Sequence, residues 1–171
     1  QSVHGNEGND AVAILGSGVH NVNLGAGDDA LLIEGGRTSA DNMDNAVNFN
    51  PTVIRGEGGN DTVNVTQNHY LDADLGEGND SIQLRAKDLT ADDTVVGGPG
   101  SDRIILTNVG ASRVDGRVLE SETVGTTGFE TYDLRDSNIT LALIDQMIET
   151  AENKSLTVDT TQATHQALPT L

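Results

Sequence analysis

The sequence predicts an all-β protein of the β-solenoid class, in which successive coils of the chain stack on one another. Three observations predict it: a glycine- and aspartate-rich turn that recurs five times, an alternating aliphatic pattern after each copy, and a second apolar segment between copies. Two strands and two turns per repeat, with one of the turns always of the same chemistry, describe one coil of a solenoid. About five coils are expected.

The recurring turn keeps a single register along the chain. In each copy a glycine stands two positions before an aspartate, and the aspartates are separated by 19, 32, 19 and 22 residues. The aspartates are Asp10, Asp29, Asp61, Asp80 and Asp102, and the glycines are Gly8, Gly27, Gly59, Gly78 and Gly100. These intervals are too long for a simple hairpin meander, so each must contain a second strand and a far turn.

Branched aliphatic residues stand two and four positions after every motif aspartate. The pairs are Val12 and Ile14, Leu31 and Ile33, Val63 and Val65, Ile82 and Leu84, and Ile104 and Leu106. This period-2 pattern is typical of a short strand with one buried face. The second strand of each interval is expected at Val22/Leu24, at Val47/Phe49 with Val53 and Ile54 nearby, at Leu71/Ala73/Leu75 and at Val95/Val96.

The composition limits both the core and the partners. Hydrophobic residues make up 35% of the 171 residues and aromatics only 2%, which predicts a narrow core of Val, Ile, Leu and Ala. There is no cysteine, so neither a disulfide nor a thiolate metal site can stabilise the fold. With a formal net charge of −18, we expect no nucleic-acid binding through a basic face, and cations are the natural partners. No apolar run is long enough to predict membrane insertion.

The repeated turn itself favours calcium. If the coils stack at the inter-strand spacing of about 4.8 Å, the motif aspartates form a column of like charges that repel unless they are neutralised. Glycines permit positive φ and so allow the turn to direct its carbonyl oxygens inward. Carboxylates with several carbonyls are the all-oxygen shell that Ca²⁺ prefers, so several Ca²⁺ ions are predicted. The alternative is that each Gly-x-Asn-Asp is an ordinary β-turn without an ion.

These turns resemble the glycine- and aspartate-rich nonapeptides of the RTX, or hemolysin-type calcium-binding, family. The segments that carry the resemblance are GNEGNDAVA, GAGDDALLI, GEGNDSIQL and GGPGSDRII, and it covers residues 5 to about 107. The resemblance implies a right-handed parallel β-roll that holds Ca²⁺ between successive turns on one edge. It also implies type I secretion and calcium-driven folding outside the cell.

The resemblance further implies a set of ligands. The side-chain ligands would be Asp10, Asp29, Asp61, Asp80 and Asp102; the carbonyl ligands would come from Gly8, Gly27, Gly59, Gly78 and Gly100, helped by Asn6, Gly25, Glu57, Gly76 and Gly98. On the far edge, His20, Asn45 and His69 stand where the family usually has aspartate, so sites there are left open. The long second coil is expected to move Asp29 away from Asp61 and to weaken that site.

The chain changes character after Thr107. Residues 108–160 are expected to form a C-terminal continuation that caps the roll, with strand signals at TYDL, NITLAL and SLTVD and a short helix near 143–152. Residues 161–171 are polar and unpatterned and are expected to fray. The order of these segments resembles large RTX adhesins and some calcium-dependent surface-layer proteins.

No catalytic constellation is present, so an enzyme is not expected. The sequence has no HExxH, no G-x-S-x-G, no P-loop and no cysteine nucleophile. Acidic residues near one far turn, Asp88, Asp92 and Asp93, form a candidate extra cation site.

The function predicted from these observations is a calcium-binding structural segment of a large secreted or cell-surface protein of adhesin or surface-layer type. The alternative is a C-terminal secretion and folding module of a type I-secreted enzyme such as a protease, lipase or polysaccharide epimerase. The expected partners beyond calcium are neighbouring repeats, copies of the same protein, or cell-surface glycans.

Overall fold

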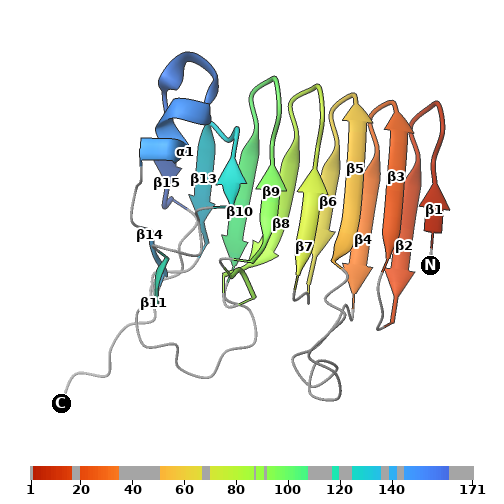
Figure 1. Cartoon of the computed structure of the whole chain (residues 1–171), viewed down its shortest axis with the longest axis horizontal. Coiled ribbons are helices and arrows are strands. Elements are labelled where there is room, and N and C mark those ends of the chain that lie inside the picture. Colours follow the sequence, from red (N-terminus) through yellow and green to blue (C-terminus); the bar gives the residue numbers. More distant parts are fainter. Residues whose placement is uncertain are drawn as a thin grey trace.

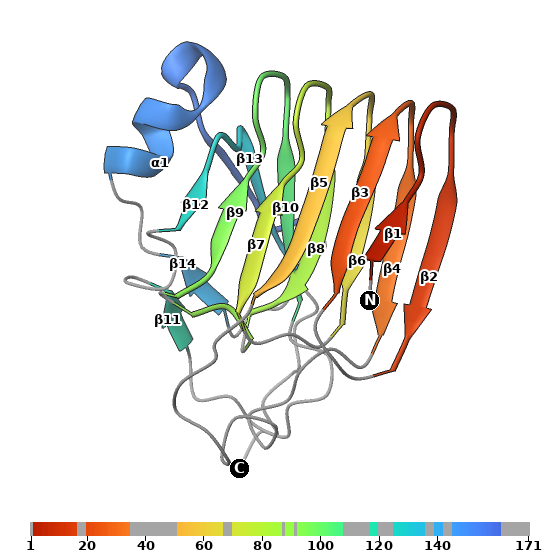
Figure 2. The same cartoon turned by 45° about the vertical axis from the view of Figure 1, so that its right-hand side comes forward.

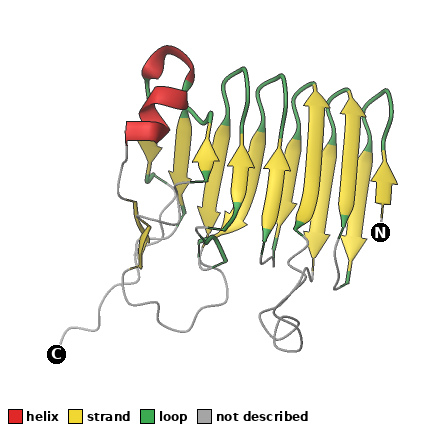
Figure 3. Ribbon diagram, viewed as in Figure 1, coloured by secondary structure: helices red, strands yellow, loops and turns green. Residues whose placement is uncertain are grey.

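The computed structural model consists mainly of parallel β-strands, with one short helix near the C-terminal end (Figure 3). The structure describes residues 2–16, 20–34, 51–66, 70–86, 88–90, 92–107, 117–119, 125–135, 139–141 and 145–161. The predicted all-β class is confirmed. Several predicted features lie outside the described residues, namely Asn45, His69, the strand signal at Val47/Phe49, and the tail beyond Thr161.

Two parallel sheets face each other, and the chain passes alternately from one to the other (Figure 1). The first sheet has the order β1 (Ser2–His4), β3 (Asn21–Ala26), β5 (Thr52–Gly58), β7 (Leu71–Asp74), β9 (Thr94–Val96), β12 (Thr126–Thr127). The second has the order β2 (Ala11–Leu15), β4 (Ala30–Glu34), β6 (Thr62–Val65), β8 (Ser81–Arg85), β10 (Arg103–Thr107), β13 (Thr131–Leu134), β15 (Thr157–Asp159). In both sheets, neighbouring strands are two places apart in the sequence order. The exceptions are β12, which pairs with β9, and β13, which pairs with β10, because β11 lies between them in the sequence but belongs to another sheet.

The strands stack in register, so that equivalent positions of the repeats become columns. Ile82 of β8 lies opposite Val63 of β6 on one side and Ile104 of β10 on the other. This register follows from the side-chain period of two, because a shift by one residue would turn every aliphatic side chain out to solvent. The same register aligns the five motif turns in a row along the stack.

The core lies between the two sheets and is as narrow as the composition predicts. All the aliphatic residues that follow the motif aspartates are buried except Val12, which is half-buried because β2 is an edge strand. The first sheet contributes the opposing layer, with Val22, Leu24, Ile54, Leu71, Ala73, Leu75 and Val95. These side chains form one continuous hydrophobic cluster along the stack.

The stack continues one strand pair beyond the five motif turns. Strands β12 and β13 add a sixth pair, and β15 then joins the second sheet beside β13. The two aromatic residues of this region, Phe129 and Tyr132, are fully buried and meet edge to face with ring centroids 6.2 Å apart. Large side chains thus fill the core where the repeating aliphatic columns end.

A short helix, α1 (Asp145–Thr150), lies at the C-terminal end of the stack (Figure 2). Its Met147 is buried against the same core cluster as Phe129, and a 3₁₀ turn, Glu152–Lys154, follows it. A separate two-stranded sheet pairs β11 (Arg117–Leu119) with β14 (Ile139–Leu141). In the part of the chain that the structure describes, no helix is long and apolar enough to span a lipid bilayer.

Candidate metal-binding edge

All five motif turns lie along one edge of the two-sheet stack, which is the upper edge in Figure 1. Each turn leads from a strand of the first sheet to the next strand of the second sheet. Because the strands are parallel and in register, the turns repeat with the spacing of neighbouring strands, about 4.8 Å. We call this row of turns, residues 5–10, 24–29, 56–61, 75–80 and 97–102, the motif edge.

The backbone of the motif edge has the same unusual conformation in every turn. Positive φ occurs at the second and the fourth position before each aspartate, as at Gly76 (97°) and Gly78 (149°). The ten residues are Asn6, Gly8, Gly25, Gly27, Glu57, Gly59, Gly76, Gly78, Gly98 and Gly100. They are the same ten positions that the RTX resemblance implied as sources of carbonyl ligands. Eight of them are glycine, which adopts this region without the steric penalty of a side chain.

The carbonyl oxygens of these residues face the next turn of the stack. A methyl group at Gly59 would lie 2.1 Å from the carbonyl oxygen of Gly27, and one at Gly78 would lie 1.8 Å from that of Gly59. The residues four positions before the aspartates behave alike: a methyl group at Gly98 would lie 2.0 Å from the carbonyl oxygen of Gly76. Two columns of carbonyl oxygens therefore run along the motif edge, and at Gly59, Gly78 and Gly98 the oxygen of the preceding turn leaves no room for a side chain.

The motif aspartates form a hydrogen-bonded ladder between turns. One carboxylate oxygen, Oδ1, accepts the backbone N–H of the aspartate in the preceding turn. The distances are 2.7 Å for Asp10 to Asp29, 3.0 Å for Asp29 to Asp61, 2.7 Å for Asp61 to Asp80 and 2.8 Å for Asp80 to Asp102. The five carboxylates therefore stand in one column, as the sequence predicted.

The other carboxylate oxygen, Oδ2, is buried and has no hydrogen-bond partner in any of the five turns. Asp29 is 2% exposed, and Asp61, Asp80 and Asp102 are each 1% exposed. The five oxygens without partners are Oδ2 of Asp10, Asp29, Asp61, Asp80 and Asp102. A buried acceptor without a donor is disfavoured, so five in one column require another partner, either a proton or a ligand.

The buried environment raises the pKa values of Asp61, Asp80 and Asp102. Burial raises the pKa of Asp61 from 3.8 to about 7, and the negative charges of Asp80, Asp29 and Asp28 raise it further against the lowering effect of the Asp29 N–H. Burial likewise raises the pKa of Asp102 to about 7 and that of Asp80 to about 6. Without a counter-ion, the ionised forms of these three aspartates are disfavoured by burial and, at Asp61 and Asp102, by repulsion from neighbouring carboxylates as well.

The donor set fits a hard cation. Each gap between successive turns has a carboxylate oxygen without a donor and carbonyl oxygens directed along the stack, which are hard oxygen ligands. Within the described residues, no three His, Asp or Glu side chains converge on one point, so side chains alone do not form a site. Any ion on this edge must take much of its coordination from the main chain, as Ca²⁺ does in flexible loops.

A second ladder, which the sequence interpretation missed, runs beside the aspartates. The residue immediately before each of the first four motif aspartates presents a side-chain oxygen that accepts the N–H of the equivalent residue in the following turn. The bonds run from Asp28 N–H to Asn9 (3.0 Å), from Asn60 to Asp28 (2.7 Å), from Asn79 to Asn60 (2.8 Å) and from Ser101 to Asn79 (2.9 Å). The Asn in each Asn-Asp pair was the available signal, and turn propensity alone did not assign it this role.

The two ladders run in opposite directions. Asp80 accepts from the turn before it, whereas Asn79 accepts from the turn after it. Each inner turn is therefore held to both of its neighbours through adjacent residues. These hydrogen bonds hold neighbouring turns at a fixed spacing along the stack without a ligand.

The long second coil does not separate Asp29 from Asp61, contrary to expectation. The Asp29 N–H donates to Asp61 at 3.0 Å, and the carbonyl oxygen of Gly27 lies directly beneath Gly59. The extra residues stand between β4 and β5 in the sequence, whereas the motif turns connect β3 to β4 and β5 to β6, so the register of the turns is unaffected. All four gaps between the motif turns have the same ladder.

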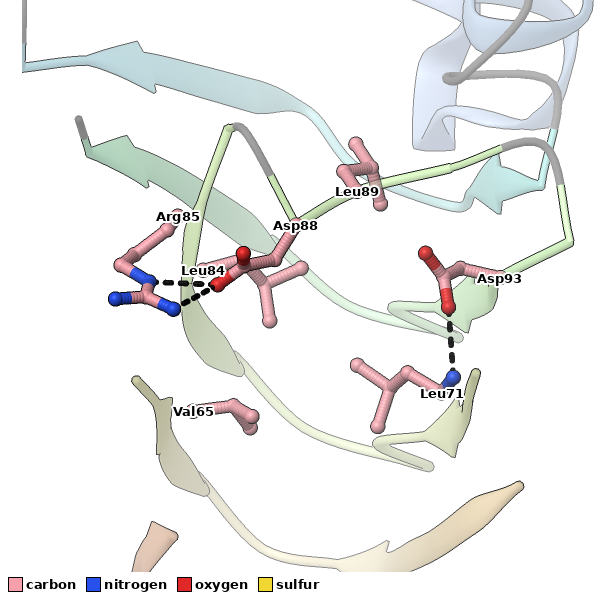
Figure 4. A pocket seen from close by; sticks show the side chains of 7 residues that line it. All are labelled: Val65, Leu71, Leu84, Arg85, Asp88, Leu89 and Asp93. Carbon is pink, nitrogen blue, oxygen red and sulfur yellow. Dashed lines mark hydrogen bonds and ion pairs between the residues drawn. The ribbon is translucent and has the colours of Figure 1, made fainter. Parts of the chain in front are cut away.

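The far edge has a different chemistry (Figure 4). Asp93 accepts the N–H of Leu71 at 2.7 Å and that of Thr90 at 2.7 Å, so its two oxygens hold the far turn together. Asp88 forms an ion pair with Arg85. The cavity that these residues line has a volume of about 10 Å³, room for about one water molecule. The group Asp88, Asp92 and Asp93 is thus not brought together as a cation site.

His20, another far-edge residue, is buried rather than exposed in a turn. It is 3% exposed, and neither ring nitrogen has a hydrogen-bond partner. Its place in the first sheet is one residue before β3, level with Thr52 and Leu71 in the neighbouring coils. It therefore belongs to the inner face of the sheet.

The fold and the motif edge together define a class: a parallel, two-sheet β protein with an oxygen-lined column along one edge. No protein-family model, curated protein or solved structure matches the chain. Its function is therefore inferred from the geometry of the motif edge.

Proposed function

We propose that the chain is a calcium-binding structural segment of a large secreted or cell-surface protein, with Ca²⁺ held between successive turns of the motif edge. In this proposal the two sheets form a right-handed parallel β-roll of the RTX type. The observation that carries the proposal is the column of five buried Oδ2 oxygens without hydrogen-bond partners. A net charge of −18 is consistent with a chain that depends on bound cations.

Each residue type on the edge would have a distinct part. Oδ2 of each aspartate would bind the ion, while Oδ1 keeps the hydrogen bond that sets the spacing of the turns. The carbonyl oxygens of the positive-φ residues would complete the coordination from the main chain. The ion would supply the positive charge that the buried carboxylates lack.

Calcium would then act as a folding switch. In a compartment with little free Ca²⁺, the ionised column would oppose folding and shift the chain toward the unfolded state. Outside the cell, where modules bind Ca²⁺ with affinities of about 10⁻⁴ to 10⁻³ M, binding would contribute folding free energy. Such a segment would serve as a rigid part of an adhesin or surface layer whose folded state is stabilised by Ca²⁺.

The direct test is a far-UV circular dichroism titration of the EDTA-treated full chain with Ca²⁺, with Mg²⁺ as the control ion. We expect a cooperative gain of β signal with Ca²⁺ that Mg²⁺ does not reproduce, because Mg²⁺ requires a small octahedral shell and gives up water reluctantly. Asp80→Asn should weaken the response, whereas Asp74→Asn, at an exposed position on β7, should not. A spectrum that is fully folded without metal and unchanged by Ca²⁺ would refute the proposal.

A further inference from the structure

A sixth turn, residues 128–130, continues the motif edge at the C-terminal end of the stack. Strands β10 and β13 pair with Arg103 opposite Thr131, which places Glu130 level with Asp102. Gly128 stands two positions before Glu130 and has positive φ (71°), as the motif glycines do. Glu130 is therefore the sixth acidic residue of the column, with glutamate in place of aspartate.

The carboxylate of Glu130 differs from the five aspartates in one respect: both of its oxygens are hydrogen-bonded. Oε2 accepts the N–H of Asp102 at 2.6 Å, which repeats the ladder of the earlier turns. Oε1 accepts the N–H of Glu152 at 2.5 Å, from the segment that follows α1. The oxygen that is left without a donor in every aspartate thus has one at Glu130.

The sixth turn also lacks the carbonyl geometry of the others. Three residues connect β12 to β13, whereas six connect β9 to β10. The position four before Glu130 is Thr126, which belongs to strand β12, so only one residue of this turn has positive φ. Gly128 consequently lies against Gly97 and Gly98 rather than above Gly100, and the carbonyl column of Gly78 and Gly100 stops there.

We propose that Glu130 ends the cation column: two backbone N–H groups hold its carboxylate in the place where a cation would otherwise be needed. The inference rests on the proposed function and limits it, because it confines the ions to the four gaps between the five motif turns. Glu130 then acts as a positioning residue that ties residues 150–152 to the last motif turn.

The wider contacts of this region agree with that role. The N–H of Gly128 donates to the hydroxyl of Thr150 at 3.1 Å, so the same segment is bound to the sixth turn at a second point. The longer glutamate side chain allows one carboxylate to reach both Asp102 and Glu152. An aspartate here would be one methylene shorter, which explains the change of residue type at the end of the series.

The test is to count bound Ca²⁺ in the full chain by native mass spectrometry and calorimetry, and to follow amide exchange by NMR in the same samples. We expect four ions for the wild type. Glu130→Ala should keep all four, while the amide of Glu152 exchanges about tenfold faster or more because its acceptor is gone. Asp102→Ala should lose at least one ion, and Asp74→Asn should lose none. Glu130→Gln, which keeps one acceptor and the side-chain length, serves if the alanine variant does not fold.

The outcomes separate this inference from the function on which it rests. If the wild type binds five ions, or if a folded Glu130 variant loses one, Glu130 is a ligand and the inference is wrong while calcium binding stands. If the Glu152 amide is unaffected in both Glu130 variants, the hydrogen bond does not hold the cap and the inference is again wrong. If the wild type binds no Ca²⁺, the proposed function itself fails.

Discussion

The backbone N–H of Asp61 donates a 2.7 Å hydrogen bond to Oδ1 of Asp80, while Oδ2 of the same carboxylate is buried without a partner. One side chain therefore has two functions. The first oxygen links neighbouring turns, and the second has no hydrogen-bond partner and is the one that the proposal assigns to a cation. Because this relationship recurs in every gap of the motif edge, the ladder that builds the stack also builds the candidate site.

Removing the charge at Asp80 should separate these two functions. In Asp80→Asn, the amide oxygen can still accept the Asp61 N–H, but the buried negative charge is gone. We expect the metal-free protein to become more stable, by about 1 kcal/mol, because desolvation of an ionised group is avoided. We also expect the stabilisation by saturating Ca²⁺ to shrink.

The measurement is thermal unfolding in EDTA and in excess Ca²⁺, with Asp74→Asn as the matched exposed control. If Asp80→Asn and Asp74→Asn respond identically to Ca²⁺, Asp80 is not a ligand.

The metal-free protein should lose stability as the pH rises from 5 to 8. The pKa values of Asp61 and Asp102 are raised to about 7 and that of Asp80 to about 6, from 3.8. A group that binds its proton more tightly in the folded state stabilises the fold fully below pH 3.8, and this contribution disappears as the pH passes through 6 to 7. The lowered pKa of Asp159 acts at more acidic pH and leaves this window unaffected.

Calorimetry of the EDTA-treated chain at several pH values checks this expectation. In Asp61→Asn the slope of stability against pH should be smaller than in the wild type. Saturating Ca²⁺ should reverse the slope, because protons and the ion compete for the same carboxylates. A metal-free protein that is more stable at pH 8 than at pH 5 would contradict the assignment of these groups.

Two glycine-to-alanine changes should distinguish backbone strain from the close approach of turns. Gly8 and Gly100 both have positive φ, but a methyl at Gly8 meets nothing within 4 Å, whereas one at Gly100 would lie 1.5 Å from the carbonyl oxygen of Gly78. We expect Gly8→Ala to cost about 1 kcal/mol and Gly100→Ala about 3 kcal/mol or more, since the second change also pushes two turns apart. Denaturant unfolding in excess Ca²⁺ measures both. Equal losses would mean that turn spacing is not constrained at Gly100.

The asparagine ladder should contribute to stability independently of metal. In Asn79→Ala the N–H of Ser101 loses its 2.9 Å acceptor, and we expect a loss of about 1 kcal/mol in EDTA and in Ca²⁺ alike. Asn79→Asp retains an acceptor, as Asp28 does at the equivalent position, and should preserve the fold. Urea unfolding of the two variants provides the comparison. A loss confined to the Ca²⁺-bound state would show that Asn79 acts through the ion instead.

Much of the architecture could be predicted because the repeats have two periodicities, the recurrence of the motif aspartates along the chain and the alternation of apolar residues after each aspartate. The interval between aspartates required two strands per coil, and the positions after Asp61 and Asp80 specified which side chains point inward. The glycines two positions before each aspartate were expected to permit positive φ, and all five have it. These are local properties, so an array of similar turns was sufficient to reveal them.

The prediction failed where the signal depended on neighbours in space. Glu130 follows its glycine by two residues and precedes Tyr132 and Leu134, yet a shortened turn and a different acid concealed the sixth member of the series. The expectation for the long second coil was also wrong, because the extra residues stand between β4 and β5 and leave the register of β4 with β6 unchanged.

The sequence by itself determined the strand pattern, the single chemically uniform edge and the column of acidic charge, because each follows from residue type at a fixed spacing. Only the tertiary structure decided which oxygen of each carboxylate is used for a hydrogen bond and which is left without a donor. It also decided that the column ends at Glu130, through an N–H supplied by a residue 22 positions further along the chain. The physical reason is that the satisfaction of a buried polar atom depends on three-dimensional neighbours, which residue spacing alone does not specify.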